Sequence, residues 1–154
     1  MLTGGDIPEG HYEDVSMERT VVPGRNTIFC AILSGLAESE GFEEIWLGLH
    51  AGDHAIYPDC RPGFYTSMRK TLHEATDGKV DLQAPFLYVT KADILKRGME
   101  LKVPYEKTRT CYKNQAIACG RCGSCSERRM SFDSLGLKDP IAYETPQFED
   151  LVKV

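Results

Sequence analysis

The clearest periodic pattern of apolar residues lies between residues 26 and 41. Apolar side chains recur there at helical spacing, in the two rows Ile28, Ile32, Leu36 and Phe29, Leu33. Asn26 occupies a position suited to an N-cap, and Gly41 follows the last periodic residue as a stop. The pattern therefore predicts a helix over 26–41.

A compact apolar run, Ile45–Leu49, follows this predicted helix after a tight turn. Polar residues and glycines flank the run, which is typical of a strand buried in a parallel sheet. A helix that leads directly into a strand is half of a parallel α/β unit. Two prolines in 53–64 then predict a loop. A second helix over 65–78 is predicted by the helical spacing of Met68, Leu72 and Ala75.

A second strand and a third helix are predicted beyond residue 78. The segment 79–89 contains a short strand, whose end is marked by Pro85. A helix over 90–101 begins with Thr90 as N-cap and Asp93 three residues later, which is an approximate capping box. Helices and strands therefore alternate, as they do in a doubly wound parallel sheet.

The predicted sheet is nevertheless short of strands. Residues 1–24 are rich in Gly, Pro, Asp and Glu, show no sustained apolar period, and are predicted to form an irregular loop. Two strands fall below the four or more that are usual in such a sheet, and no first strand with a phosphate loop is found. The pattern indicates the α/β class, with a partial doubly wound parallel sheet that corresponds to the latter part of a domain.

Composition and charge narrow the classes of function. A chain of 154 residues with 42% hydrophobic residues has the size of one ordinary domain. Its formal net charge of −5 argues against a generally basic surface for nucleic acid and leaves only local basic patches, such as Arg128–Arg129. No apolar stretch approaches the roughly 20 residues that cross a bilayer, and the start does not resemble a signal peptide. We therefore expect a soluble, cytoplasmic protein without a membrane partner.

The six cysteines point to a metal site. Four of them crowd into 111–125 with the spacing C-x7-C-x2-C-x2-C, whereas Cys30 and Cys60 stand alone. In a chain that is not secreted, such clustering favours metal binding over disulfides. Zinc accepts four thiolates in a tetrahedron with no open position, which makes it a structural ion. We expect the zinc ligands to be Cys111, Cys119, Cys122 and Cys125.

Other chemistry fits the same spacing less well. A [4Fe–4S] cluster also uses C-x2-C-x2-C, but a ferredoxin-like run carries a proline after a further cysteine. A thioredoxin-like pair needs its C-x2-C at a strand-to-helix turn, and four free thiols are the remaining alternative. A nucleic-acid finger would use Arg121, Arg128 and Arg129, although these arginines equally fit a solvated helix. Gly120 and Gly123 suit a metal knuckle, because glycine readily adopts positive φ.

Three stretches carry a family resemblance: VVPGRNTIF (21–29), GLHAGDHAIYPDCRPGF (48–64) and CYKNQAIACGRCGSC (111–125). In this order and spacing they resemble the 7-cyano-7-deazaguanine synthase family of queuosine biosynthesis. The stretches DIPEGHYED, KADILKRGMELKVP and DPIAYE are also similar to that family. The resemblance therefore covers nearly the whole chain.

The resemblance implies an ATP-dependent C–N ligase with an adenine-nucleotide alpha hydrolase-like, Rossmann-like fold. Members convert 7-carboxy-7-deazaguanine and ammonia to the nitrile: the carboxylate is activated with ATP, ammonia captures it as an amide, and the amide is activated again and loses its oxygen. The implied cofactors are ATP with Mg²⁺ and a structural Zn²⁺. Such a site needs phosphate-binding N–H groups, cationic charge and polar groups for the purine edge.

Local chemistry suggests which residues contact nucleotide or substrate, although no catalytic residue is assigned. Arg25 and Asn26 offer a cation and an amide at a helix N-terminus, which favours an anion; alternatively, Asn26 is only a cap and Arg25 a surface residue. The loop after the first strand lies where α/β ligands usually bind. Its candidate ligands and proton shuttles are His50, Asp53, His54, Tyr57, Asp59 and Arg61. Cys60 is expected to be a buried, inert thiol, and Cys30 a core residue.

One part of the family pattern is absent. Members open with a strand and an S-G-G-x-D-S loop that grips the ATP phosphates, whereas LTGGDIPEG carries only a glycine pair. We therefore expect 1–108 to be the C-terminal part of the nucleotide domain and 109–154 a zinc-binding segment. The expected partner is a chain that carries the missing N-terminal half, or a second copy. The alternative is a deazapurine-binding module without catalysis or a zinc-knuckle interaction domain, and HAGDHAIYPDCRP argues against a bare knuckle.

Overall fold

The fold consists of two compact units. The computed structural model describes residues 6–11, 14–113 and 115–145. One unit is Val22–Thr90, and the other combines the described parts of Met1–Val21 and Lys91–Val154. No helix within the described residues is long and apolar enough to span a bilayer.

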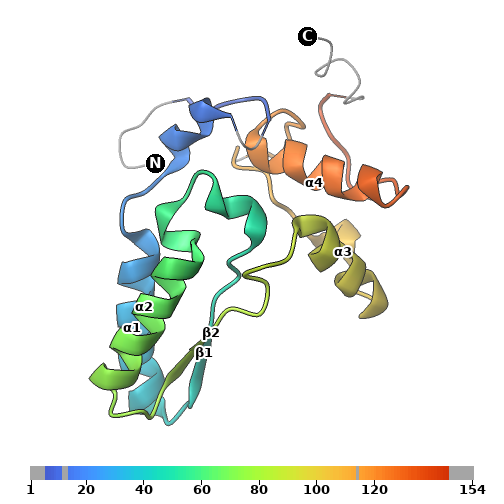
Figure 1. Ribbon diagram of the computed structural model, residues 1–154. Helices are drawn as coiled ribbons and strands as arrows, with labels where there is room; N and C mark the ends of the chain where they lie inside the picture. Colours follow the sequence, from blue (N-terminus) through green and yellow to red (C-terminus); the bar gives the residue numbers. More distant parts are fainter. Residues whose placement is uncertain (1–5, 12–13, 114, 146–154) are drawn as a thin grey trace. The chain divides into compact units, whose positions relative to one another are not determined.

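The unit Val22–Thr90 is a parallel α/β unit (Figure 1). Its main elements, in chain order, are α1 (Arg25–Glu40), β1 (Glu44–Trp46), α2 (Pro62–Ala75) and β2 (Asp81–Gln83). β1 pairs with β2 in parallel, with Ile45 opposite Leu82. The mixture of helices and a parallel sheet confirms the predicted α/β class.

Both α-helices of this unit, α1 and α2, pack on one face of the sheet. The core contains side chains from all four elements and the turn before β2: Cys30, Ala37, Ile45, Leu72, Val80 and Leu82. Cys30 is fully buried, which confirms its predicted place in the core. Tyr65 of α2 donates a hydrogen bond of 3.1 Å to the carbonyl of Leu82 and so ties helix to strand. The carboxyl ends of both strands lead into loops, and the N–H of Ala51 donates to the carbonyl of Val89 at 2.9 Å between them.

The ends of α1 correct one prediction and confirm another. The helix begins at Arg25, and its N-cap is Gly24 with φ 69°. Asn26 lies inside the first turn, so its prediction as the N-cap is wrong. Gly41 ends the helix with φ 75°, as predicted, because glycine adopts this left-handed conformation without a steric penalty.

The strands and the loop between them differ in detail from the pattern. β1 is shorter than the predicted Ile45–Leu49, and only Ile45 of its three residues is buried. The predicted loop contains two short 3₁₀ helices, η2 (Ala51–His54) and η3 (Pro58–Cys60). α2 begins within that loop at Pro62, because proline is well tolerated in the first helical turn, where its missing N–H has no partner to lose.

The second unit contains the remaining helices, η1 (Val15–Thr20), α3 (Lys91–Glu100), η4 (Tyr105–Lys107) and α4 (Gly123–Ser134). α3 begins directly after Thr90, as predicted. The prediction of an irregular loop over 1–24 is wrong for Val15–Thr20, where Met17 is buried; residues 1–5 and 12–13 lie outside the described residues. The rings of Tyr105 and Phe132 meet edge to face, 5.6 Å apart. The functional division into 1–108 and 109–154 follows motifs rather than contacts and stays a prediction.

Candidate functional site

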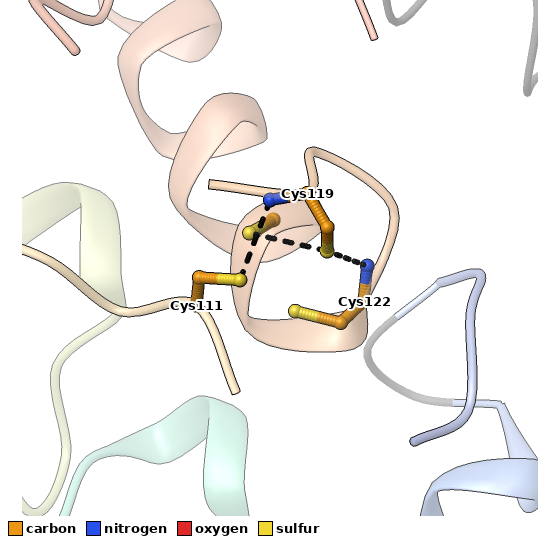
Figure 2. Close-up of side chains that lie close together, drawn as sticks. Cys111, Cys119 and Cys122 are labelled. Atoms are coloured by element: carbon orange, nitrogen blue, oxygen red, sulfur yellow. Dashed lines mark hydrogen bonds between the residues drawn. The ribbon is translucent and has the colours of Figure 1, made fainter. Parts of the chain in front are cut away.

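Four cysteine sulfurs gather at the N-terminal end of α4. The sulfurs of Cys111, Cys119, Cys122 and Cys125 all lie within 4.8 Å of one another. Cys111 comes from the preceding loop, and Figure 2 shows its sulfur pointing toward those of Cys119 and Cys122. Cys119, Cys122 and Cys125 are at most 1% exposed. A compact set of four thiol groups of this kind can hold a metal ion.

Backbone N–H groups turn toward these sulfurs. The Cys119 sulfur accepts from the N–H groups of Arg121 and Cys122, at 3.5 and 3.3 Å. The Cys111 sulfur accepts from the N–H of Cys119 at 3.4 Å. Gly120 has φ 75°, a conformation that favours glycine. A Cβ at this position would also lie 2.3 Å from the hydroxyl oxygen of Thr145, so both the backbone and the space require glycine. These bonds favour the thiolate form, which is the form that binds metal.

Gly123 does not share this role. The φ of Gly123 is not positive, and Gly123 is the first residue of α4. The prediction that both glycines supply positive φ is therefore right for Gly120 and wrong for Gly123. The helix can begin here because Cys122, in extended conformation, precedes it as N-cap.

Hydrogen bonds between the thiols set their acidity. The hydrogen bond from the Cys125 thiol lowers the pKa of Cys122, although burial opposes it. The same bond, together with burial, raises the pKa of Cys125. Burial is the main cause that raises the pKa of Cys119. Hydrogen bonds from neighbouring thiols and amides thus favour a thiolate at Cys122, and metal binding would release the remaining thiol protons.

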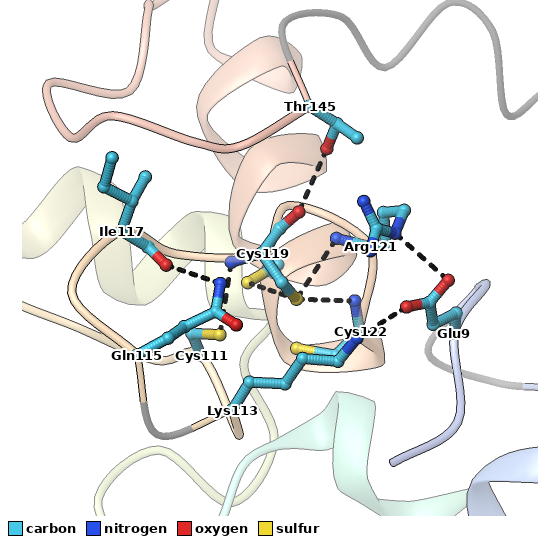
Figure 3. A network of polar contacts seen from close by, with 10 residues as sticks. Glu9, Cys111, Lys113, Gln115, Ile117, Cys119, Arg121, Cys122 and Thr145 are labelled. Atoms are coloured by element: carbon cyan, nitrogen blue, oxygen red, sulfur yellow. Dashed lines mark hydrogen bonds and ion pairs between the residues drawn. The ribbon is translucent and has the colours of Figure 1, made fainter. Parts of the chain in front are cut away.

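The segment before η1 holds the knuckle from outside, as Figure 3 shows. Glu9 accepts from Lys113 at 2.7 Å and from Arg121 at 3.1 Å. These two bonds, with that from Lys113 the stronger cause, lower the pKa of Glu9 although burial opposes them. The N–H of Gly10 donates to the carbonyl of Arg121 at 3.0 Å, and Ile7 packs against the cysteines. Sequence reasoning missed Glu9, because a lone acid in an aperiodic stretch gives no signal of a distant partner.

The two arginines of α4 correct the prediction of a basic patch. Arg128 is 5% exposed and forms a bidentate ion pair with Asp139, with distances of 2.7 and 3.0 Å. The guanidinium of Arg129 lies 4.8 Å from the ring centre of Tyr143, and it donates to the carbonyl of Gly120 at 3.3 Å. Both side chains therefore fasten the segment after α4 to the helix. These two arginines therefore form neither a solvated helix face nor a surface for nucleic acid.

A second group of candidate residues meets at the N-terminus of α1. The N–H of Asn26 donates to the Asp59 carboxylate at 3.0 Å. The amide of Asn26 donates to the carbonyl of Asp59 at 3.0 Å and to the sulfur of Cys60 at 3.4 Å. The Asp59 carboxylate thus accepts from an N–H group in the first turn of α1, as an N-cap side chain usually does, although Asp59 lies 33 residues further along the chain. Arg25 is exposed on the same turn.

The loop after β1 is held by its own polar groups. His50 is 6% exposed; its Nδ1 accepts from the N–H of Gly52 at 3.1 Å, and its Nε2 lies 3.4 Å from an oxygen of Asp53. Arg61 donates from Nε to the carbonyl of His54 at 2.8 Å. Tyr57 is also buried. The loop is therefore preorganised, while the roles of its residues toward a ligand stay predictions.

Two further groups in this loop differ in their surroundings. Cys60 is 4% exposed, and burial, followed by the charges of Asp53 and Asp59, raises its pKa to about 12. This confirms that Cys60 is a buried thiol, since a thiolate would be needed for nucleophilic chemistry. Nε2 of His54 is buried and has no hydrogen-bond partner within the described residues.

Comparison with known proteins identifies the family. The family model described as "Queuosine biosynthesis protein QueC" matches residues 1–136. Proteins named 7-cyano-7-deazaguanine synthase from Rhizobium rhizogenes and Hahella chejuensis are 46% and 48% identical over 93% and 90% of this chain, which covers 61% and 60% of their lengths. That from Caldicellulosiruptor bescii is 48% identical over 90% of this chain, which covers 63% of it. The chain spans about three fifths of the length of these curated relatives. It belongs to the QueC family of queuosine biosynthesis proteins.

Proposed function

We propose that this chain provides the substrate loop and the metal centre of a 7-cyano-7-deazaguanine synthase. The observation that carries this proposal is the 46–48% identity to proteins of that name over at least 90% of the chain. Because the chain covers only about three fifths of those relatives, the complete activity depends on polypeptide that supplies the remainder, including the phosphate-binding loop.

The reaction converts a carboxylate to a nitrile. Nitrogen comes from ammonia, and both carboxylate oxygens must leave, one when the amide forms and one when the nitrile forms. Oxygen is a poor leaving group on carbon, and phosphoryl or nucleotidyl transfer from ATP with Mg²⁺ supplies a good one. The protein therefore has to hold a planar purine, its carboxylate and the nucleotide in line, with water excluded.

Residues at the carboxyl end of β1 suit the binding of the purine and its carboxylate. Arg25 and Arg61 carry the cationic charge that a carboxylate or phosphate requires. Asp53 accepts hydrogen bonds, as the N–H edge of a guanine-like ring requires, and Tyr57 provides a flat face and a hydroxyl. His50, whose Nε2 lies 3.4 Å from an oxygen of Asp53, is the residue to which we assign proton transfer. The preorganised loop supports this assignment, because a site of this kind must not rearrange at each turnover.

The metal is proposed to be structural zinc. Four sulfur ligands complete a tetrahedral shell, so no position remains for water or substrate. Its function is to fix the residues from Cys111 to Cys125, and with them the segments held by Glu9 and Arg129. Elemental analysis is expected to give about one zinc per chain, and iron with visible absorption would replace this proposal by a cluster.

A reconstitution assay tests the enzymatic function. The chain is co-expressed with the part of the Hahella chejuensis relative that it does not match, and the complex is supplied with 7-carboxy-7-deazaguanine, ammonia and MgATP. The nitrile, detected by mass spectrometry, is the expected product, with none in the absence of ATP. A stable complex that binds the substrate and forms no nitrile would favour the alternative, a deazapurine-binding module without catalysis.

A further inference from the structure

The outward face of α1 is unusual for the surface of a protein. Five large apolar side chains are between 39% and 63% exposed: Ile28, Phe29, Ile32, Leu33 and Leu36. At about 100° per residue they fall within an arc of about 140°. The buried side of the same helix carries only smaller side chains, Asn26, Cys30, Ser34 and Ala37. A helix with its larger apolar residues outside and smaller ones inside is typical of an element covered on both sides.

The sheet beside α1 is incomplete in the same region. Within the described residues β1 pairs only with β2, and a two-stranded sheet has little stability of its own. Ile45 points to the helices, so Glu44 and Trp46 point to the opposite face, where Trp46 is 63% exposed. Phe42, at the turn between α1 and β1, is 65% exposed. Parallel sheets are normally covered by helices on both faces, whereas α1 and α2, the α-helices described in this unit, both lie on the face that holds Ile45.

The direction in which the sheet grows follows from the helices. α2 connects β1 to β2 on one face, and α1 enters β1 on that same face. Right-handed crossovers on one face add strands in one direction. A parallel strand that precedes α1 in the chain order therefore belongs on the edge of β1 that β2 does not occupy.

We propose that the outward face of α1 and the free edge of β1 form the surface that binds the part of the synthase for which this chain has no counterpart. This inference rests on the proposed function and deepens it by naming the interface. The relatives carry about two fifths of their length beyond the part that this chain covers, which is enough for several strands and their helices. A second copy is the competing occupant, but it would bring the same two-stranded unit again and not the part of the relatives that this chain lacks.

The structure supplies variants that isolate this surface. Ile32→Asp places a charge at the centre of the apolar arc, on a side chain that is 63% exposed, so the fold of the unit should tolerate it. Phe29→Ser removes a neighbouring apolar side chain without adding charge. Ala31→Asp adds the same charge to the same helix at an exposed position outside the arc and is the matched control.

Binding is measured between the full chain and the unmatched part of the Hahella chejuensis relative, by sedimentation velocity, without substrate or ATP. Ile32→Asp is expected to weaken binding roughly 30-fold or more, Phe29→Ser to weaken it less, and Ala31→Asp to leave it unchanged. Equal binding by all three variants, or a dimer of this chain that Ile32→Asp dissociates and the partner does not displace, would overturn the proposal. Nitrile formation is assayed separately. If the partner binds through this face but no nitrile forms, the proposed function is wrong and the proposed surface stands. If nitrile forms and Ile32→Asp does not alter its formation, the proposed surface is wrong and the proposed function stands.

Discussion

Replacing Asp139 by asparagine removes the charge that balances Arg128 in the interior of the cysteine unit. Both side chains of this ion pair are 6% exposed. Asp139 accepts two bonds from Arg128, one of 2.6 Å from the hydroxyl of Tyr143, and one of 3.2 Å from the N–H of Ile141. Asparagine keeps the shape, but its amide presents donors where a guanidinium and a hydroxyl also donate.

The expected cost follows from the burial of the arginine. Arg128 also donates to the hydroxyl of Thr108 at 2.7 Å and to the carbonyl of Tyr105 at 3.1 Å, so it cannot move to solvent without breaking neutral bonds. Removing one partner of a buried ion pair usually costs about 3–5 kcal/mol. Since those two bonds remain, we expect about 3 kcal/mol for Asp139→Asn. Glu100→Gln removes the exposed partner of Arg97 in the same unit and is expected to cost almost nothing.

The stabilising effect of Asp139 depends on pH in a direction that follows from its pKa. Burial raises the pKa of Asp139, but the hydrogen bonds from Arg128 and Tyr143 outweigh it, so the pKa lies below its ordinary value. A lowered pKa contributes stability that is fully present above the unfolded value, about 3.9, and is lost as the pH falls through the folded value. The difference between wild type and Asp139→Asn should therefore be largest near neutrality and shrink in acid below about pH 4.

Hydrogen exchange of α4 amides, followed by mass spectrometry, measures this stability locally. The single tryptophan of the chain, Trp46, lies in the other unit, and its fluorescence during urea unfolding serves as an internal control. Asp139→Asn should accelerate exchange in α4 and leave the Trp46 transition in place. A loss below about 1 kcal/mol, or one equal to that of Glu100→Gln, would refute the view that this ion pair is a buried structural link.

Three further predictions address other parts of the chain. Cys122→Ala, or a strong zinc chelator, should remove the metal and accelerate hydrogen exchange over the cysteine cluster while the Trp46 unfolding transition stays unchanged; protection that survives metal loss would contradict a structural ion. Asp59→Ala should lower the stability of the Val22–Thr90 unit by about 1 kcal/mol, measured by urea unfolding, because the N–H of Asn26 loses its acceptor. Cys60, with a pKa of about 12, should react with iodoacetamide at pH 8 only when urea unfolds the unit, and rapid labelling of the native chain would show that the thiol is accessible.

Much of the fold was predictable because its signals are local. Helical spacing and the glycine stop fix α1 to within one residue, and Pro85 correctly limits β2. The errors occur where a distant partner replaces a local one. Asn26 looks like an N-cap in the sequence, yet the group that caps the helix is Asp59, 33 residues further along the chain. A pattern limited to neighbouring residues cannot contain that information.

The cysteine cluster was predictable for the same reason, since its four cysteines lie within 15 consecutive residues. What surrounds it was not. In the sequence, Arg128 and Arg129 resemble a basic patch. Their partners, Asp139 and Tyr143, follow in an aperiodic segment, which gives no signal of these contacts. Glu9 was missed because its partners are more than 100 residues away. Ion pairs between segments that are far apart carry no periodic signature, whereas metal ligands carry a spacing.

The connectivity gives the cysteine cluster a consequence beyond its own segment. The chain passes through the cysteine unit twice, first with residues that include Glu9 and again from Lys91 onward, so that Val22–Thr90 is an insertion between two parts of one unit. Glu9 joins these two parts through Lys113 and Arg121, on either side of Cys119. A metal that fixes the knuckle therefore fixes the positions of both of its cationic partners, and with them the anchor of the first passage. The proposed metal therefore stabilises the contact between the two parts of this unit, which precede and follow Val22–Thr90 in the chain.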